Sequence, residues 1–383
     1  MELTPLPLEA PLQQYREQAA SLLEAWRAGD ASAIQIVRHK HPRFLNPAIP
    51  WLPKRLTDAE VRSEPFELPD AELTVARAYD FENWARLAEH VAAVTDQGSA
   101  VWRFESAADA VVHGHLDTLD SLLRAHPDLV HARSTRVTLF NPPVHRATLL
   151  HYVAANGVEG YRQKTPANAV AVAKMLLDAG ADPRALASMY GGEHATMSLL
   201  VSSAPPARAG VQVALVETLA DFGAEVEGPG SGDGASPLMT ALAFGFAGAA
   251  EALVRRGARV DTLAAAAGLG HVADARVMLT TASPEDRHRA LALATQHGHA
   301  EIVRILLDAG EDPNRYNPDG NHPHSTPLHQ AALSGHEDVV RLLVGRGVRL
   351  DMKDRIYEST PLGWALHSGR DAIAEYLRAH GAE

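Results

Sequence analysis

Cysteine is absent from this chain of 383 residues, and so is any excess of basic residues. Without cysteine, neither a disulfide framework nor a thiolate metal site can form. Lysine and arginine together number 35 against 47 aspartates and glutamates, which gives a formal charge of -12. Nucleic-acid binding needs a clustered basic face, and no Lys/Arg run supplies one. We therefore expect no nucleic-acid partner.

Long apolar runs are also lacking. No segment approaches the roughly 18 apolar residues that a membrane-spanning helix needs, and residues 1–23 have neither the basic start nor the apolar centre of a secretory signal. We therefore expect a cytoplasmic protein that makes no contact with a membrane. Lysine is rare beside arginine and alanine is abundant; we interpret this residue usage as that of a GC-rich bacterial gene.

One stretch near the C-terminus carries a recognisable motif, Thr326-Pro327-Leu328-His329-Gln330-Ala331-Ala332-Leu333-Ser334-Gly335-His336, followed by Val339-Val340-Arg341-Leu342-Leu343. It resembles one unit of an ankyrin repeat, whose signature is T-P-L-H-x-A in a period of about 33 residues. A second Thr-Pro-Leu opening follows 34 residues later, at Thr360. Proline in the first turn of a helix loses no needed N–H, and the glycine permits the tight joint between two helices.

Weaker copies of the pattern run from about residue 102 to the end. Aligned on their glycines, the units are 104–134, 147–185, 190–227, 233–261, 262–281, 287–314, 325–351 and 359–383. The resemblance implies an all-α ankyrin-repeat solenoid of about eight helix-pair units over residues 101–383, with a concave groove along one side. In this family the T-P-L-H histidines, here His151 and His329, hold the turn.

The N-terminal hundred residues fit the pattern less well. We interpret residues 1–100 as a helical capping region, because terminal repeats are atypical. Residues 13–44 are predicted to form a degenerate helix pair, and the proline-rich residues 45–69 an extended connector. Asp70 is predicted to be the N-cap of a helix that ends at Tyr79, and a further helix is predicted over residues 82–95.

The resemblance also indicates where a ligand binds. In the family, the groove is lined by the two residues that precede the first glycine of each unit. Here these positions include Asn156, Ser202, Ser203, Phe244, His297 and His367. The alternative is that they are simply solvated side chains at helix ends.

Two insertions break the pattern at the same joint of consecutive units. The second unit carries eleven extra residues, 158–168, and the third carries residues 205–210. Consecutive repeats stack on each other, so we expect the two loops to lie side by side as a lid over the groove.

The insertions carry Tyr161, Arg162, Lys164 and Arg208, cations and an aromatic ring in a chain of negative charge. We predict that they form an anion clasp with Asn156, Ser202 and Ser203 as its floor. Glu159 and Tyr190 complete the candidate ligand contacts. As an exposed loop residue, Arg162 could be replaced by alanine with a stability change below about 0.5 kcal/mol. The alternative is that these cations merely solubilise two surface loops.

Two functions fit this sequence. The first is a cytosolic binding or adaptor protein that recognises a protein segment or a small anionic ligand through its groove. The second is an enzyme whose small anionic substrate lies between insertions 158–168 and 205–210 and the finger 188–196. Its catalytic candidates are Glu193, His194 and Tyr161. No G-x-S-x-G, H-E-x-x-H or phosphate-binding glycine loop occurs, which favours binding. We expect a monomer without cofactor or metal.

Overall fold

The computed structural model describes residues 2–228 and 236–383 of the chain. It divides into two units, Met1–Val211 and Gln212–Glu383, which we call the N-terminal and C-terminal units. This division falls inside the predicted repeat array, and the predicted boundary at residue 100 stays a prediction. The first residues of the predicted fourth unit, 233–235, lie outside the described residues.

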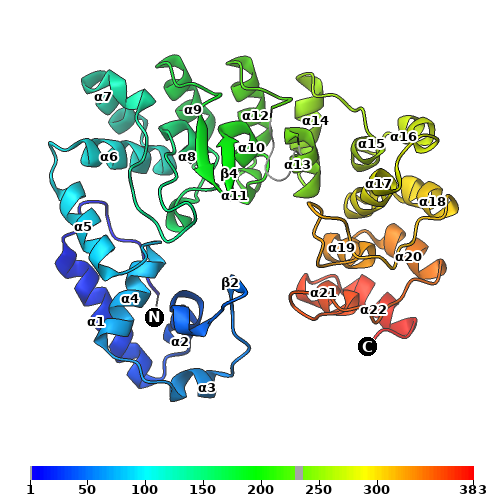
Figure 1. The fold of residues 1–383 in the computed structure, drawn as a ribbon, viewed down its shortest axis with the longest axis horizontal. Helices are drawn as coiled ribbons and strands as arrows, with labels where there is room; N and C mark the ends of the chain where they lie inside the picture. Colours follow the sequence, from blue (N-terminus) through cyan, green and yellow to red (C-terminus); the bar gives the residue numbers. More distant parts are fainter. Residues whose placement is uncertain (1, 229–235) are drawn as a thin grey trace. The chain divides into compact units, whose positions relative to one another are not determined.

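The N-terminal unit is built mainly from helices (Figure 1). Its helices and strands are α1 Leu12–Ala28, α2 Ala31–Lys40, η1 Pro42–Phe44, β1 Leu45–Asn46, β2 Ile49–Pro53, α3 Asp58–Ser63, α4 Leu68–Ala78, α5 Trp84–Thr95, α6 Ala100–His113, α7 Leu116–Ala125, η2 Pro127–His131, α8 Leu149–Val153, η3 Gly160–Arg162, α9 Ala169–Asp178, β3 Leu186–Met189, β4 Gly192–Ala195, α10 Thr196–Leu200 and α11 Ala204–Arg208.

The first five helices share one apolar core. α1 packs on α4, and α2 packs on both of them. Leu22, Trp26, Phe44 and Val75 lie in this core and are buried. The burial of these apolar side chains supplies the main driving force for the packing. The predicted helix pair over residues 13–44 and the predicted helix over residues 82–95 are therefore confirmed as α1, α2 and α5.

The segment between these helices differs from the prediction in two respects. Residues 45–69 are not extended throughout, because β1 and β2 pair as an antiparallel hairpin and α3 follows them. Asp70 is not an N-cap. α4 begins earlier, after Glu67, and the Asp70 carboxylate accepts the Glu67 N–H at 2.9 Å. Pro69 fits within the first turn of the helix, which allows the earlier start.

The rest of the N-terminal unit follows the predicted repeat pattern. α6 packs on α7, and α8 packs on α9, as helix pairs. Gly114 ends α6 with φ 72°, a backbone conformation that glycine adopts at little cost. β3 and β4 form an antiparallel hairpin, the finger of the third repeat. Its Ser188 N–H donates to the His145 carbonyl in the preceding finger at 2.8 Å.

The C-terminal unit is a row of helix pairs (Figure 1). Its helices are α12 Gln212–Asp221, α13 Pro237–Ala243, α14 Ala247–Arg255, α15 Leu263–Leu269, α16 Val272–Leu279, α17 Pro284–Gln296, α18 Ala300–Asp308, α19 Pro327–Ser334, α20 Glu337–Gly345, α21 Pro361–His367 and α22 Asp371–Ala379.

The order in which these helices pack defines a solenoid. The first helices of the pairs, α13, α15, α17, α19 and α21, each contact the next one in the row, and α16, α18, α20 and α22 do the same. Leu291, Leu306 and Leu328 are fully buried between successive layers. The helices of each layer thus pack mainly on those of the neighbouring layers. The all-α solenoid predicted from the sequence is confirmed.

The two T-P-L-H histidines hold their turns as predicted. In the C-terminal unit, Nδ1 of His329 lies 2.7 Å from Thr326 Oγ1 and accepts the Thr326 N–H at 3.3 Å. Its Nε2–H donates to the Ser359 carbonyl at 3.0 Å. His151 makes the same contacts with Thr148, at 2.8 and 3.1 Å. Each imidazole therefore joins the start of one helix to the following finger.

Candidate binding sites

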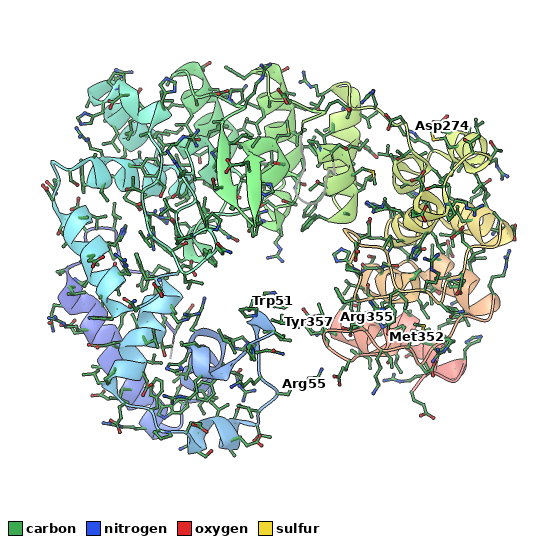
Figure 2. The ribbon with its side chains drawn as sticks, viewed as in Figure 1. Trp51, Arg55, Asp274, Met352, Arg355 and Tyr357 are labelled. Atoms are coloured by element: carbon green, nitrogen blue, oxygen red, sulfur yellow. The ribbon has the colours of Figure 1, made fainter. Side chains whose placement is uncertain are left out.

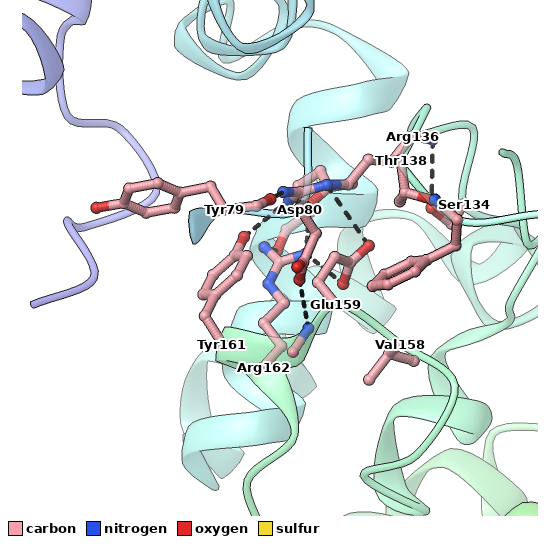
Figure 3. Close-up of polar contacts among 12 residues, drawn as sticks. Tyr79, Asp80, Ser134, Arg136, Thr138, Val158, Glu159, Tyr161 and Arg162 are labelled. Carbon is pink, nitrogen blue, oxygen red and sulfur yellow. Dashed lines mark hydrogen bonds and ion pairs between the residues drawn. The ribbon is translucent and has the colours of Figure 1, made fainter. Parts of the chain in front are cut away.

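The insertion 158–168 lies against the N-terminal helices and closes a buried ionic cluster with them (Figure 3). Arg162 Nη1 lies 2.5 Å from Glu105 Oε2 on α6 and 3.7 Å from Glu159 Oε2. Arg136, from the loop between η2 and α8, completes the cluster, with its Nε 3.6 Å from Glu159 Oε1. The four charged side chains are at most 3% exposed. Two arginines and two glutamates thus balance each other away from solvent.

The same cluster fastens the insertion to the end of α4. The Gly160 N–H donates to Asp80 Oδ2 at 2.5 Å, and the Tyr161 hydroxyl accepts a hydrogen bond from Arg136 Nη1 at 2.8 Å. The Tyr161 ring meets the Tyr79 ring edge-on, with centroids 5.5 Å apart. Arg136 Nη2 also donates to the Tyr79 carbonyl at 2.6 Å. The insertion therefore holds the N-terminal helices on the first repeats.

The electrostatics of the cluster agree with a structural role for Arg162. Burial alone lowers the pKa of this guanidinium, but Tyr161, Glu105 and Glu159 outweigh it and leave the pKa above its usual value. Burial raises the pKa of the Asp80 carboxyl, although the hydrogen bond from Gly160 lowers it. Arg162 therefore stays charged, and its counter-charges come from the protein itself.

The prediction that Arg162 is an exposed loop cation is wrong, because its side chain is 1% exposed. Lys164 and Arg208 are exposed, as predicted. No hydrogen bond or ion pair joins residues 158–168 to residues 205–210, both of which lie in the described part of the chain. The second insertion forms the short helix α11 instead of a lid loop. The described contacts therefore do not assemble the predicted anion clasp.

Three of the predicted groove residues do meet. The Tyr190 hydroxyl donates to Asn156 Oδ1 at 2.7 Å and accepts the Gly157 N–H at 3.2 Å. Asn156 Nδ2 donates to Ser202 Oγ at 2.9 Å. Ser203 is buried and donates to the Ala155 carbonyl at 3.2 Å. This network fixes the finger 188–196 on the end of α8 and leaves Tyr190 64% exposed.

Glu193 and His194 do not converge on a common point. They are neighbours in β4, and successive side chains of a strand point to opposite faces. Glu193 is exposed and accepts a hydrogen bond from Ser188, whereas His194 is 5% exposed. Burial lowers the pKa of His194. The hairpin therefore does not bring these two side chains together as the predicted acid and base on one substrate. Tyr161, the third catalytic candidate, belongs to the ionic cluster.

The remaining groove candidates lie in the C-terminal unit and differ from one another. His297 is half-buried, and its Nε2–H donates to the Leu242 carbonyl at 2.8 Å. Its imidazole therefore joins α17 to α13. Burial lowers its pKa. Phe244 is 50% exposed at the end of α13. His367 is exposed at the end of α21 and lines a hollow described next.

A hollow of about 390 Å³ lies between the last two repeats. Its lining residues are Leu333, Tyr357, Ser359, Gly363, Trp364 and His367, and we call it the terminal groove. Leu333 is 37% and Tyr357 52% exposed, so apolar surface faces solvent here. The Trp364 indole N–H donates to Asp354 Oδ2 at 3.1 Å, which fixes the ring in the wall.

Sequence reasoning missed several residues of these sites. Leu333 and His367 stand at the family's groove positions, but Tyr357 and Trp364 were not identified. An aromatic residue in the last finger, three positions before the Thr-Pro-Leu opening, is the signal that could have found Tyr357. Glu105 and Arg136 lie 57 and 26 residues before Arg162, and no local motif connects them.

The described residues offer neither a membrane-spanning helix nor a metal site. None of their helices combines the length and apolar character needed to cross a membrane. No group of three or more histidine, aspartate or glutamate side chains is arranged there to hold a metal ion.

Comparison with known proteins agrees with the repeat architecture. Residues 207–317 and 316–383 match the family model described as ankyrin repeats (3 copies). "Ankyrin repeat and KH domain-containing protein mask-1" of Caenorhabditis elegans is 28% identical over 291 residues, which cover 73% of this chain and 10% of that protein.

Two mouse proteins match shorter segments. "Inactive serine/threonine-protein kinase TEX14" is 39% identical over 88 residues, 23% of this chain and 6% of the relative. "Ankyrin repeat and SAM domain-containing protein 6" is 35% identical over 109 residues, 27% of this chain and 12% of the relative. The chain thus spans at most about an eighth of these three relatives. These relatives are eukaryotic, and the bacterial origin stays a prediction. Residues 207–383 are thus similar to ankyrin repeats.

Proposed function

We propose that this chain is a protein-interaction module that holds a segment of a partner protein in the terminal groove. The observation that carries the proposal is the exposed apolar surface between Leu333 and Tyr357. The similarity of residues 207–383 to ankyrin repeats supports the proposal, since such repeats form a rigid stack whose concave side is a binding surface.

The chemistry of the groove suits an apolar side chain flanked by peptide backbone. Tyr357 and Trp364 offer ring surface, while the Ser359 hydroxyl and the His367 imidazole offer hydrogen-bonding groups at the rim. The rings of Tyr357 and Trp364 both lie close to His324, at centroid distances of 6.2 and 5.7 Å. A wall fixed in this way loses little conformational entropy when it binds a ligand. Aromatic residues are also the usual binding hot spots.

The test is selection of a peptide from a random phage-displayed library against the full chain, followed by calorimetry. Tyr357→Ala should weaken the selected peptide by about 2 kcal/mol or more, the scale of an aromatic hot spot. The control is Val277→Ser, because Val277 is 72% exposed on α16 and does not line the groove. Equal affinities for the two variants would place the peptide elsewhere and contradict the proposal.

The sequence-based predictions of a cytoplasmic location and a monomeric state belong to the same proposal. A monomer is consistent with a groove that takes a segment of another protein. We do not extend the proposal to catalysis, because Glu193 and His194 point to opposite faces of their hairpin.

A further inference from the structure

A second hollow in the C-terminal unit lies near a short finger. Only residues 280–283 connect α16 to α17, whereas residues 309–326 connect α18 to α19 and residues 346–360 connect α20 to α21. The two long fingers touch through the Arg355 N–H, which donates to the His324 carbonyl at 2.8 Å. A hollow of about 690 Å³ lies between finger 309–326 and the start of α17, and residues of the last finger also line it.

Three arginines line this hollow, which we call the arginine hollow. They are Arg289 on α17, Arg315 on finger 309–326 and Arg355 on the last finger, beside Met352 (Figure 2). Among the residues that the structure describes, none of the three forms an ion pair with a carboxylate. By contrast Arg287, on the same helix as Arg289, pairs with Glu311 at 3.2 Å.

Two of these guanidinium groups are nevertheless held in place. Arg289 Nη2 donates to the Asp319 carbonyl at 3.2 Å. The Arg355 guanidinium lies over the Tyr316 ring, 3.9 Å from its centroid. Such a stacked arginine keeps its N–H groups available at the edge of the plane. The cations are therefore pre-positioned without being neutralised.

The hollow also contains carboxylates, which limit its charge. Glu285 and Asp319 line it together with the three arginines. The local balance is three positive against two negative charges, in a chain whose formal charge is -12. A small excess of positive charge thus stands out locally. It suits one compact anion rather than an extended polyanion.

Two buried polar side chains of the lining each have one atom without a hydrogen-bond partner among the described residues. His288 is 7% and Asn317 4% exposed, and both line the hollow. In the described part of the chain, His288 Nε2 and Asn317 Oδ1 make no hydrogen bond. Both atoms are covered by the protein, so they make the wall of the hollow polar without contacting a ligand in it. Burial lowers the pKa of His288, which keeps the ring neutral at pH 7.

We infer that the arginine hollow binds an oxyanion, a carboxylate or phosphate group, held by Arg289 and Arg315 with Arg355 at its rim. Guanidinium groups recognise such oxyanions by charge-assisted, often bidentate hydrogen bonds. Inorganic phosphate and the carboxylates of a glutamate-containing peptide both present such an oxyanion. The inference uses other residues than the terminal groove and is independent of the proposed function.

The experiment is isothermal titration of the full chain, in a chloride buffer of low ionic strength, with inorganic phosphate and separately with a blocked tetra-glutamate peptide. A blocked tetra-glutamine peptide is the uncharged comparison. At least one anion should bind saturably and the tetra-glutamine peptide should not. Saturable binding of phosphate alone identifies a free oxyanion as the ligand, and binding of the glutamate peptide alone identifies an acidic segment of a partner.

Matched variants locate the site. Arg289→Gln and Arg315→Gln should each weaken binding by at least about tenfold, the effect of losing one hydrogen bond to a charged group. Arg304→Gln removes the same charge from an exposed position on α18 that does not line the hollow, and binding should stay within about twofold. The His288 ring resonances should shift with phosphate or peptide in the unaltered chain. The inference is overturned if neither anion binds saturably, or if Arg304→Gln weakens binding as much as Arg315→Gln.

Discussion

Arginine has two different roles in the two units of this chain. In the N-terminal unit, Arg162 is buried and meets the carboxylates of Glu105 and Glu159. In the C-terminal unit, Arg289 and Arg315 line a hollow and have no carboxylate partner among the described residues. The residue type is the same, and what differs is the source of the counter-charge. An arginine is available to a ligand only where the fold does not neutralise it.

The largest expected effect comes from replacing Arg162, the buried arginine of this comparison. Arg162→Ala leaves Glu105 and Glu159 buried with one cation fewer, and removing one partner of a buried ion pair costs about 3–5 kcal/mol. We expect a loss of this size in the free energy of unfolding of the N-terminal unit. Urea denaturation, with hydrogen exchange to assign the loss to residues 1–211, measures it.

Two controls separate burial from loop position. Lys164→Ala changes an exposed residue of the same insertion and should alter stability by less than about 0.5 kcal/mol. Arg315→Gln should have an equally small effect in the C-terminal unit, because this side chain is exposed and forms no ion pair there. If Arg162→Ala is as mild as Lys164→Ala, the ionic cluster does not hold the insertion.

A second prediction concerns the packing of buried leucines in the C-terminal unit. Leu306 and Leu377 are both fully buried, but α18 packs between α16 and α20, whereas α22 packs on α20 and α21 at the end of the row. Leu306→Ala should cost about 2–5 kcal/mol, because a cavity opens between layers that relax little. Leu377→Ala should cost less. Denaturant titration compares them, and equal losses would argue against packing between neighbouring layers alone.

The third prediction uses the histidines that hold corresponding turns in the two units. Burial lowers the pKa of His151 from 6.5 to about 4, and its Nδ1 accepts hydrogen bonds that a proton would abolish. Between these pH values the unfolded chain binds a proton that the folded chain does not. The stability contribution is therefore complete above pH 6.5 and is lost as the pH falls toward 4, by about 3 kcal/mol at most.

Urea titrations of the intact chain and of His151→Gln between pH 7 and 4 measure this loss. The variant should show a shallower fall of stability with falling pH in the N-terminal unit, whatever its stability at pH 7. Burial also lowers the pKa of His329, so His329→Gln should flatten the same dependence in the C-terminal unit. Parallel pH profiles of the variants and the intact chain would mean that neither imidazole is kept neutral by the fold.

These histidines also show how much of the fold the sequence predicts. Thr148 and His151 are three residues apart, as are Thr326 and His329, so each turn is specified within one short motif. The same holds for the proline at the start of α19 and the glycine that follows it. Local signals of this kind repeat along the chain, and the helix pairs could therefore be predicted in order.

The sites depend on distant residues and could be predicted only in part. Glu105 on α6 neutralises Arg162 from 57 residues away, and no pattern near the insertion reveals it. The cations of the insertion were identified correctly, but their surroundings were not. Conversely, the arginine hollow lies near the short finger 280–283. The short predicted unit 262–281 indicates such a finger, but not which side chains line the space beside it. Counter-charges and hollows are properties of packing, and the sequence shows neither directly.

The smallest expected effect concerns the arginines that line the arginine hollow. If Arg289, Arg315 and Arg355 form a site for one compact anion, they should not make the chain a nucleic-acid-binding protein. Such binding draws its free energy from counterions released by several cations that follow the phosphate backbone. The hollow also contains Glu285 and Asp319, and the chain carries a formal charge of -12. We expect no mobility shift with random duplex or single-stranded DNA or RNA at physiological salt. Retention that weakens steeply as salt rises would show that these arginines belong to an extended basic surface instead.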